Sequence, residues 1–182
     1  MYSENTGNRR GETLGFSLIA DHTCNCIFDI TGHYLAEKGI SLLLADLDNT
    51  LVPYGVALPT DEVYAWRDEL KQAGVQLFVL SNNRRVGRPD KFCQALEVPF
   101  IGHAGKPKIG GLLKAMEQMG VTPAQTALIG DQIFTDVLGG NRAGVMTILV
   151  KPIRLAGNPG RYVRYAAELP FRAFSARGGN KR

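Results

Sequence analysis

The sequence predicts an α/β protein built on a Rossmann-like, doubly wound parallel sheet. Two observations lead to this fold class. Short and almost wholly apolar segments, typical of strands buried on both faces, alternate with amphipathic segments at helical spacing. Short glycine- or proline-containing connections join them, as in repeated strand–helix–strand units. With 182 residues and 45% hydrophobic residues, the chain is expected to form a single domain, with a core at about 40–150 and a basic extension at 151–182.

The first half of this pattern begins with the apolar run Leu42–Ala45, which is expected to be a buried strand. A loop over 51–58 follows, and Thr60 is placed to cap a helix that Gly74 ends. Apolar residues recur along that helix at helical spacing, so one of its faces should pack on the sheet. Val75–Leu80 follows at once as a second strand.

The second half repeats the alternation. Pro89 suits a first helical position, so a helix is expected over Asp90–Leu96, ahead of a short strand at Val98–Ile101. Further helices are expected over Ile109–Met119 and from about Thr135 to Arg142, each followed by a glycine. Two more apolar strands, Thr126–Gly130 and Val145–Val150, complete the sheet.

Polar residues gather where these strands end. Asp46 and Asp48 follow the first strand, Ser81 and Asn82 the second, and Asp131 a later one. The carboxyl ends of parallel strands meet at one edge of a sheet, where ligands bind. An isolated Asp-x-Asp is more often a turn, but its companions at the same edge favour a site. Two neighbouring acids need a cation, and magnesium suits oxygen ligands.

These residues carry the parts that phosphoester hydrolysis requires: a nucleophile, an acid, phosphate donors and cation ligands. In order along the chain they resemble the four motifs of the haloacid-dehalogenase (HAD) phosphatase superfamily, type IIIA branch. The motifs are Asp46–Thr50, Ser81–Asn83, Lys106-Pro107 and Gly130–Asp136. The run Gly130–Gly144 further resembles the small YqeG-like group, which is similar to phosphatidylglycerophosphate phosphatases. The resemblance implies a HAD-like fold and covers roughly residues 42–150.

The resemblance implies roles for the matching residues. Asp46 would attack phosphorus and form an aspartyl-phosphate, while Asp48 would protonate the leaving group and later activate water. Mg²⁺ would be held by Asp46, Asp131 and the backbone carbonyl of Asp48. Thr50, Ser81 and Asn82 would bind the phosphoryl group. Lys106 would also bind it and would balance Asp46.

Some residues near the motifs keep open roles. Asp136 could bind the cation directly, bind it through water, or bind the lysine. Lys108 lies two residues beyond Lys106 and is expected at the rim of the site or in solvent. Arg84 and Arg85 could recognise a second anionic group, with solvated loop positions as an equal alternative.

The spacing of the motifs leaves no room for a cap domain, the inserted domain with which such phosphatases select substrates. Thirty residues separate Thr50 from Ser81, and 22 separate Asn83 from Lys106. A capless enzyme suits a large substrate presented at a surface, or closure by a partner subunit. The resemblance therefore favours phosphatidylglycerophosphate, in phospholipid metabolism. Phosphatases for soluble sugar or nucleotide phosphates, and a non-catalytic binding module, are the alternatives.

The C-terminal segment points to an anionic partner. Residues 151–182 carry eight Lys or Arg against the single acid Glu168, whereas the preceding residues sum to a net charge of −3. An anionic membrane surface fits this segment and nucleic acid is not expected, although a solvated, partly disordered tail is the alternative. No secretory signal and no apolar run long enough to cross a bilayer occur in the sequence. A cytoplasmic protein is expected, with peripheral contact at the inner membrane face.

Overall fold

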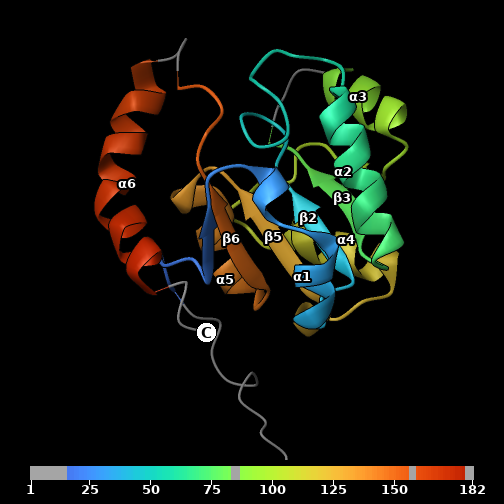
Figure 1. The fold of residues 1–182 in the computed structure, drawn as a ribbon. Coiled ribbons are helices and arrows are strands. Elements are labelled where there is room, and N and C mark those ends of the chain that lie inside the picture. The colour runs from blue at the N-terminus through green and yellow to red at the C-terminus, as the bar shows by residue number, and fades with distance from the viewer. Residues whose placement is uncertain (1–15, 83–86, 156–158, 179–182) are drawn as a thin grey trace, which may run out of the picture.

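The computed structural model describes residues 16–82, 87–155 and 159–178, and these form a parallel sheet covered by helices (Figure 1). Six strands follow the order β1-β6-β5-β2-β3-β4, and every neighbouring pair is parallel. The strands are β1 (His22–Cys24), β2 (Leu42–Ala45), β3 (Gln76–Leu80), β4 (Phe100–Ile101), β5 (Thr126–Gly130) and β6 (Met146–Val150). The predicted fold class is confirmed.

Helices lie on both faces of the sheet, and a long one borders its β1 edge. They are α1 (Gly32–Glu37), α2 (Asp61–Gln72), α3 (Arg88–Leu96), α4 (Gly110–Met119), α5 (Leu138–Ala143) and α6 (Pro159–Gly178), with single turns η1 (Ile27–Asp29), η2 (Pro123–Gln125) and η3 (Ile133–Val137). Of these, α1, α2 and α3 pack on one face of the sheet, and α4 and α5 pack on the other. Among the described residues, no helix is both long and apolar enough to cross a membrane.

The core explains why the middle strands read as continuous apolar runs. All four side chains of β2 are buried, and they alternate between the two helical layers: Leu43 and Ala45 face α2, whereas Leu42 and Leu44 face α4. Helix α2 begins as predicted, because the Thr60 hydroxyl accepts a hydrogen bond from the Val63 N–H. Buried Trp66 and Leu70 then anchor it to the sheet.

Several boundaries differ from the sequence prediction. Helix α3 begins at Arg88, two residues before the predicted Asp90, because Gly87 is its N-cap residue. Strand β4 is two residues shorter at its start, because Val98 N–H closes helix α3 on Cys93 and Pro99 has no N–H to donate. The helix expected from Thr135 begins two residues earlier as a π-helical turn, η3, before α5. Strand β1 lies outside the predicted core range; it is a short edge strand of mixed polarity that the apolar pattern did not reveal.

The basic C-terminal segment forms a helix against the domain over residues 159–178, so this part of it is not a disordered tail. Phe171 of α6 packs on Ile133, Val137 and Leu149, and the Ser175 hydroxyl accepts from the Ala20 N–H. Figure 1 shows α6 running along the β1 side of the sheet, from the edge where the strands end to the opposite edge. The segment begins beside the carboxyl ends of the strands, where the polar residues gather.

Replacing the buried core residue Leu44 by Ala should lower the free energy of unfolding by about 2–5 kcal/mol, since a fully buried leucine leaves a cavity that the strands cannot close. Leu113→Ala on α4, where the side chain is 46% exposed, is the matched control and should change stability by no more than about 0.5 kcal/mol. Urea unfolding followed by circular dichroism measures both. Equal losses for the two variants would contradict the assignment of the core.

Candidate active site

The site lies at the carboxyl edge of the sheet, because three neighbouring strands end there in polar residues. Asp46 directly follows β2, Ser81 follows β3, and Asp131 follows β5. All three are buried, with no more than 6% of their surface exposed. Lys106, which lies a few residues beyond β4, is buried beside them. The folding of the sheet thus collects side chains that lie far apart in the sequence.

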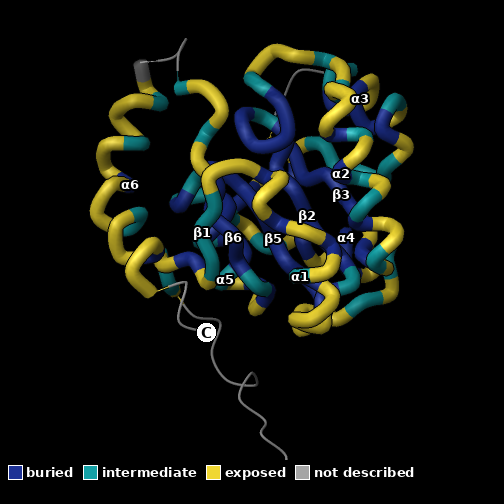
Figure 2. The backbone as a smooth tube through the Cα atoms, viewed as in Figure 1, coloured by how far each residue is buried: buried dark blue, intermediate teal, exposed yellow. Residues whose placement is uncertain are grey.

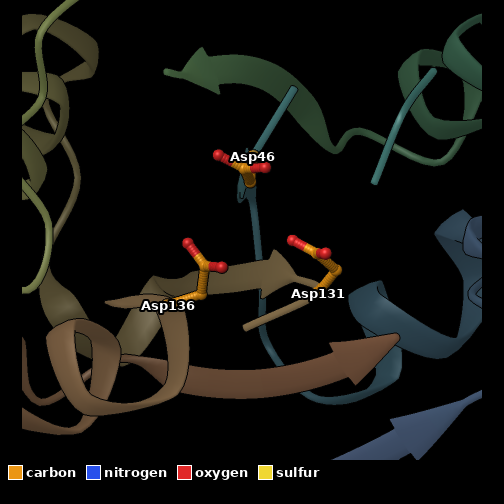
Figure 3. A group of neighbouring side chains, drawn as sticks. All are labelled: Asp46, Asp131 and Asp136. Atoms are coloured by element: carbon orange, nitrogen blue, oxygen red, sulfur yellow. The ribbon is translucent and has the colours of Figure 1, made fainter. Parts of the chain in front are cut away.

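Three carboxylates converge at this edge. Each of Asp46, Asp131 and Asp136 offers an oxygen within 4.8 Å of those of the other two, and Figure 3 shows the side chains turned toward a common space. The first two belong to the predicted metal set. Asp136 joins them because η3 turns its side chain back toward β5, and only glycine fits at Gly130, where a Cβ would overlap the Asp136 carboxylate.

Lys106 links two of these carboxylates. Its Nζ lies 2.7 Å from Asp46 Oδ1 and 2.7 Å from Asp136 Oδ1, and it donates to the Leu80 carbonyl at 2.9 Å. The ammonium group is thus surrounded by two hydrogen-bond acceptors, Asp46 Oδ1 and the Leu80 carbonyl, and by its ion pair with Asp136. Of the alternatives for Asp136, the structure shows contact with the lysine, and Lys108 is exposed as expected.

The electrostatics of this cluster fit a divalent cation. Burial raises the pKa of Asp46 to about 6, although the Lys106 ammonium opposes the shift. Burial also raises the pKa of Asp131 to about 7, to which the charges of Asp46 and Asp136 add. Burial alone would lower the pKa of Lys106, but the two carboxylates hold it above its ordinary value. In the part of the chain that the structure describes, Lys106 and Arg161 are the cations that pair with the three carboxylates, so a hard cation would complete the balance of charge.

The predicted phosphate-binding residues have different environments. Thr50 is buried, and its hydroxyl lies 3.5 Å from Asp46 Oδ2. Asn82, the third residue of the predicted phosphate-binding set, contacts the backbone of Lys106 in this structure. Its Oδ1 accepts from the Lys106 N–H and its Nδ2 donates to the Lys106 carbonyl, both at 2.9 Å. Both ends of the amide are thus used to hold the backbone of the lysine.

Arg88 is a site residue that the sequence did not reveal. Its guanidinium pairs with the Asp48 carboxylate, and it also bonds the carbonyls of Pro53 and Val56 at 3.4 and 2.8 Å. It therefore fixes the loop after β2 against Asp48. Helical position alone does not distinguish such an arginine from a solvated one. Asn83, Arg84 and Arg85, named above, lie outside the described residues.

Helix α6 holds the loop that carries Asp131. Glu168 is buried; its Oε1 accepts from the N–H groups of Ile133 and Phe134 at 2.9 and 3.2 Å, and its Oε2 pairs with Arg172 at 2.9 Å. Arg172 also donates to the Asp131 carbonyl.

Arg161, from the first turn of the same helix, pairs with Asp131 Oδ2 at 2.8 Å. A small surface pocket lies at this junction, lined by Asp131, Gln132, Leu155, Arg161, Arg164, Tyr165, Glu168 and Arg172. Sequence reasoning missed this contact, because Glu168 looks like a single acid in a basic tail.

Comparison with known proteins matches this arrangement. A family described as HAD-hydrolase-like matches residues 103–152. The chain is 36% identical over 158 residues to "Probable phosphatase YqeG" of Bacillus subtilis, covering 87% of this chain and 90% of that protein. It is 30% identical over 133 residues to chloroplastic phosphatidylglycerophosphate phosphatase 1 of Chlamydomonas reinhardtii, covering 69% of this chain but only 49% of that protein.

A solved structure supports the fold. The deoxy-D-mannose-octulosonate 8-phosphate phosphatase of Haemophilus influenzae superposes with a TM-score of 0.51 at 19% identity, over 76% of this chain and 92% of that one. Fold and comparisons together define a phosphatase of the HAD class. Within that class, the chain belongs to the YqeG-like family.

Replacing Glu168 by Gln should weaken the apparent affinity for an activating divalent cation by about tenfold. The loop that carries Asp131 is held by the Glu168 carboxylate, and a neutral amide would hold it less firmly. Glutamine keeps the size of the side chain but not its ion pair with Arg172. The measurement is phosphoester hydrolysis as a function of cation concentration. The rate at saturating cation should fall less than the affinity. Glu117→Gln, at an exposed position of α4, is the control and should change neither. An unchanged half-saturation in Glu168→Gln would show that α6 does not position Asp131.

Cation binding should compete with protonation of Asp131 and Asp46. Their pKa values of about 7 and about 6 lie above the ordinary 3.8, so the cation-free fold favours the protonated acids. Raising the pH from about 5 to about 8 ionises them and should lower the Tm of the cation-free protein, whereas added divalent cation should restore it chiefly at the higher pH. Thermal unfolding at both pH values measures the effect. Asp131→Asn should reduce the pH dependence, and a cation-induced increase in Tm of the same size at both pH values would argue against this site.

Proposed function

We propose that this chain is a Mg²⁺-dependent phosphatase that works through an aspartyl-phosphate on Asp46 and acts on phosphatidylglycerophosphate. The observation that carries the proposal is the buried cluster at the sheet edge, where Lys106 joins Asp46 to Asp136 and Asp131 completes the group of carboxylates. We further propose that the whole chain forms one domain, with α6 as an integral part of it.

The proposed first step is attack by a carboxylate oxygen of Asp46 on phosphorus. The phosphorus–oxygen ester bond breaks, and the leaving oxygen takes a proton from the Asp48 carboxyl group. Asp48 pairs with Arg88 in this structure, so it has to release the arginine before it can act as the acid. In the second step Asp48 takes a proton from water, which attacks phosphorus, and the bond from phosphorus to Asp46 breaks.

Other residues of the chain would hold the reacting groups. Lys106, next to Asp46 at 2.7 Å, places positive charge beside the nucleophile. Thr50, buried next to Asp46, and Ser81, buried at the end of the neighbouring strand β3, would orient the phosphoryl group. Asn82 would also donate to the phosphoryl group, and in this structure its amide holds the Lys106 backbone.

Mg²⁺ would be held by Asp46, Asp131 and the Asp48 carbonyl, and when bound it supplies charge that offsets the negative phosphoryl oxygens. Asp136 would act on it through the lysine. The cluster offers carboxylate oxygens, which are hard ligands, and it carries excess negative charge. Both properties favour Mg²⁺ over softer metals.

Three observations support a lipid substrate. The algal relative is named as a phosphatidylglycerophosphate phosphatase, although the chain spans about half of its length. The described parts of the two insertion points for a cap contain one helix each, α2 and α3, an arrangement that would suit a bulky phosphate. Exposed bases of the C-terminal segment, including Lys151, Arg154, Arg164 and Arg177, would attract an anionic membrane at the cytoplasmic face.

Purified protein in mixed micelles of detergent and phosphatidylglycerophosphate should release inorganic phosphate when Mg²⁺ is present and stop when the cation is chelated. Asp46→Asn should lower the rate by at least about a thousandfold, since it removes the nucleophile. Asp61→Asn, at the exposed start of α2, is the matched control and should retain the wild-type rate.

A lipid left intact while a soluble sugar or nucleotide phosphate is hydrolysed would shift the assignment to soluble substrates. Full function in Asp46→Asn would indicate a binding module instead.

A further inference from the structure

Three segments border the site, and each is tied to one of its residues. In the first, Pro53–Leu58, Arg88 bonds the carbonyls of Pro53 and Val56 while pairing with Asp48. In the second, Lys151–Leu155, the Ile153 N–H donates to the Asn49 carbonyl at 3.0 Å. The third, Arg161–Tyr165, begins with the arginine that pairs with Asp131. We call these three segments the active-site rim.

The rim is unusually apolar for an exposed surface. It contains six of the twelve large hydrophobic residues that the described part of the chain exposes. These are Tyr54 (52%), Val56 (38%), Leu58 (60%), Ile153 (50%), Tyr162 (51%) and Val163 (72%). Single exposed apolar side chains are ordinary, but a set gathered from three separate segments around one site marks a binding surface.

The charges of the rim all have one sign. Its three segments contain Lys151, Arg154, Arg161 and Arg164 and no acidic residue. Lys151, Arg154 and Arg164 are exposed, whereas Arg161 points inward to Asp131. Figure 1 shows the loop after β2, the segment after β6 and the start of α6 at the same end of the molecule, and Figure 2 shows exposed residues in all three.

We propose that the active-site rim is the docking surface for an anionic lipid bilayer, which would present headgroup phosphates to Asp46. The inference rests on the proposed lipid phosphatase activity. Tyrosines and aliphatic side chains enter the interfacial layer, and the bases among them bind anionic headgroups. Charge favours this partner over a second copy of the chain, because a symmetric contact would bring the rim cations of both copies together.

The test is sedimentation of the full chain with vesicles. Wild type should bind vesicles made from equal parts of phosphatidylcholine and phosphatidylglycerol more strongly than vesicles of phosphatidylcholine alone, and high salt should weaken the binding. The double variant Leu58→Ser/Val163→Ser should reduce the partition onto the anionic vesicles by about tenfold or more, since two exposed apolar side chains are lost from the interface. Both positions are exposed, so the variant should fold, and its hydrolysis of a soluble phosphoester should stay at the wild-type rate.

Phe174→Ser is the matched control. Phe174 is 59% exposed on the same helix, next to Ser175, which bonds Ala20 at the far edge of the sheet. It should bind vesicles like wild type. Three results would each overturn the proposal: unchanged binding of the double variant, a loss confined to Phe174→Ser, or a wild-type protein that is a dimer in solution and becomes a monomer in the double variant.

Failure of the proposed function would look different. The wild-type protein would then leave phosphatidylglycerophosphate intact even in mixed micelles, whatever its binding to vesicles. Hydrolysis in micelles with no effect of the rim variant on vesicles would instead retain the function and reject the docking surface.

Discussion

The ammonium group of Lys106, buried between Asp46 and Asp136, is the interaction on which the site depends. Three carboxylates so close together cannot all stay ionised away from water without nearby positive charge. Lys106 provides that charge through its contacts with Asp46 and Asp136, and Asn82 holds the backbone from which the lysine extends. The sheet brings the strand ends together, and this lysine, from another part of the sequence, offsets the repulsion between their carboxylates.

Helix α6 extends that arrangement to the other side of Asp131. Glu168 gives two N–H groups of η3 an acceptor, Arg172 holds the carbonyl of Asp131, and Arg161 meets its carboxylate. The segment that composition marks as a basic tail is therefore a support for a candidate cation ligand. The described part of this phosphatase contains no inserted cap, and the C-terminal helix and the loop after β2 border the site instead.

Much of the fold could be predicted because its signals are local. Buried parallel strands leave apolar runs in the sequence, and helix ends leave caps such as Thr60 and Gly74, so sheet and helices follow from short segments. Two of the errors occur where long-range contacts decide. The early start of η3 depends on a glutamate 35 residues away, and the edge strand β1 exists through its pairing with β6.

The sequence by itself determined the class of protein and the candidate residues of the site. Asp46 and Asp131 lie in short motifs at strand ends and Lys106 lies in a Lys-Pro motif on a loop, and the chemistry of such residue types is independent of their exact geometry. Only the tertiary structure decided which groups meet: Asp136 with Lys106, Arg88 with Asp48, and α6 with Asp131. These contacts join residues from separate elements, and side-chain contacts across such distances leave no periodicity or motif in a single sequence.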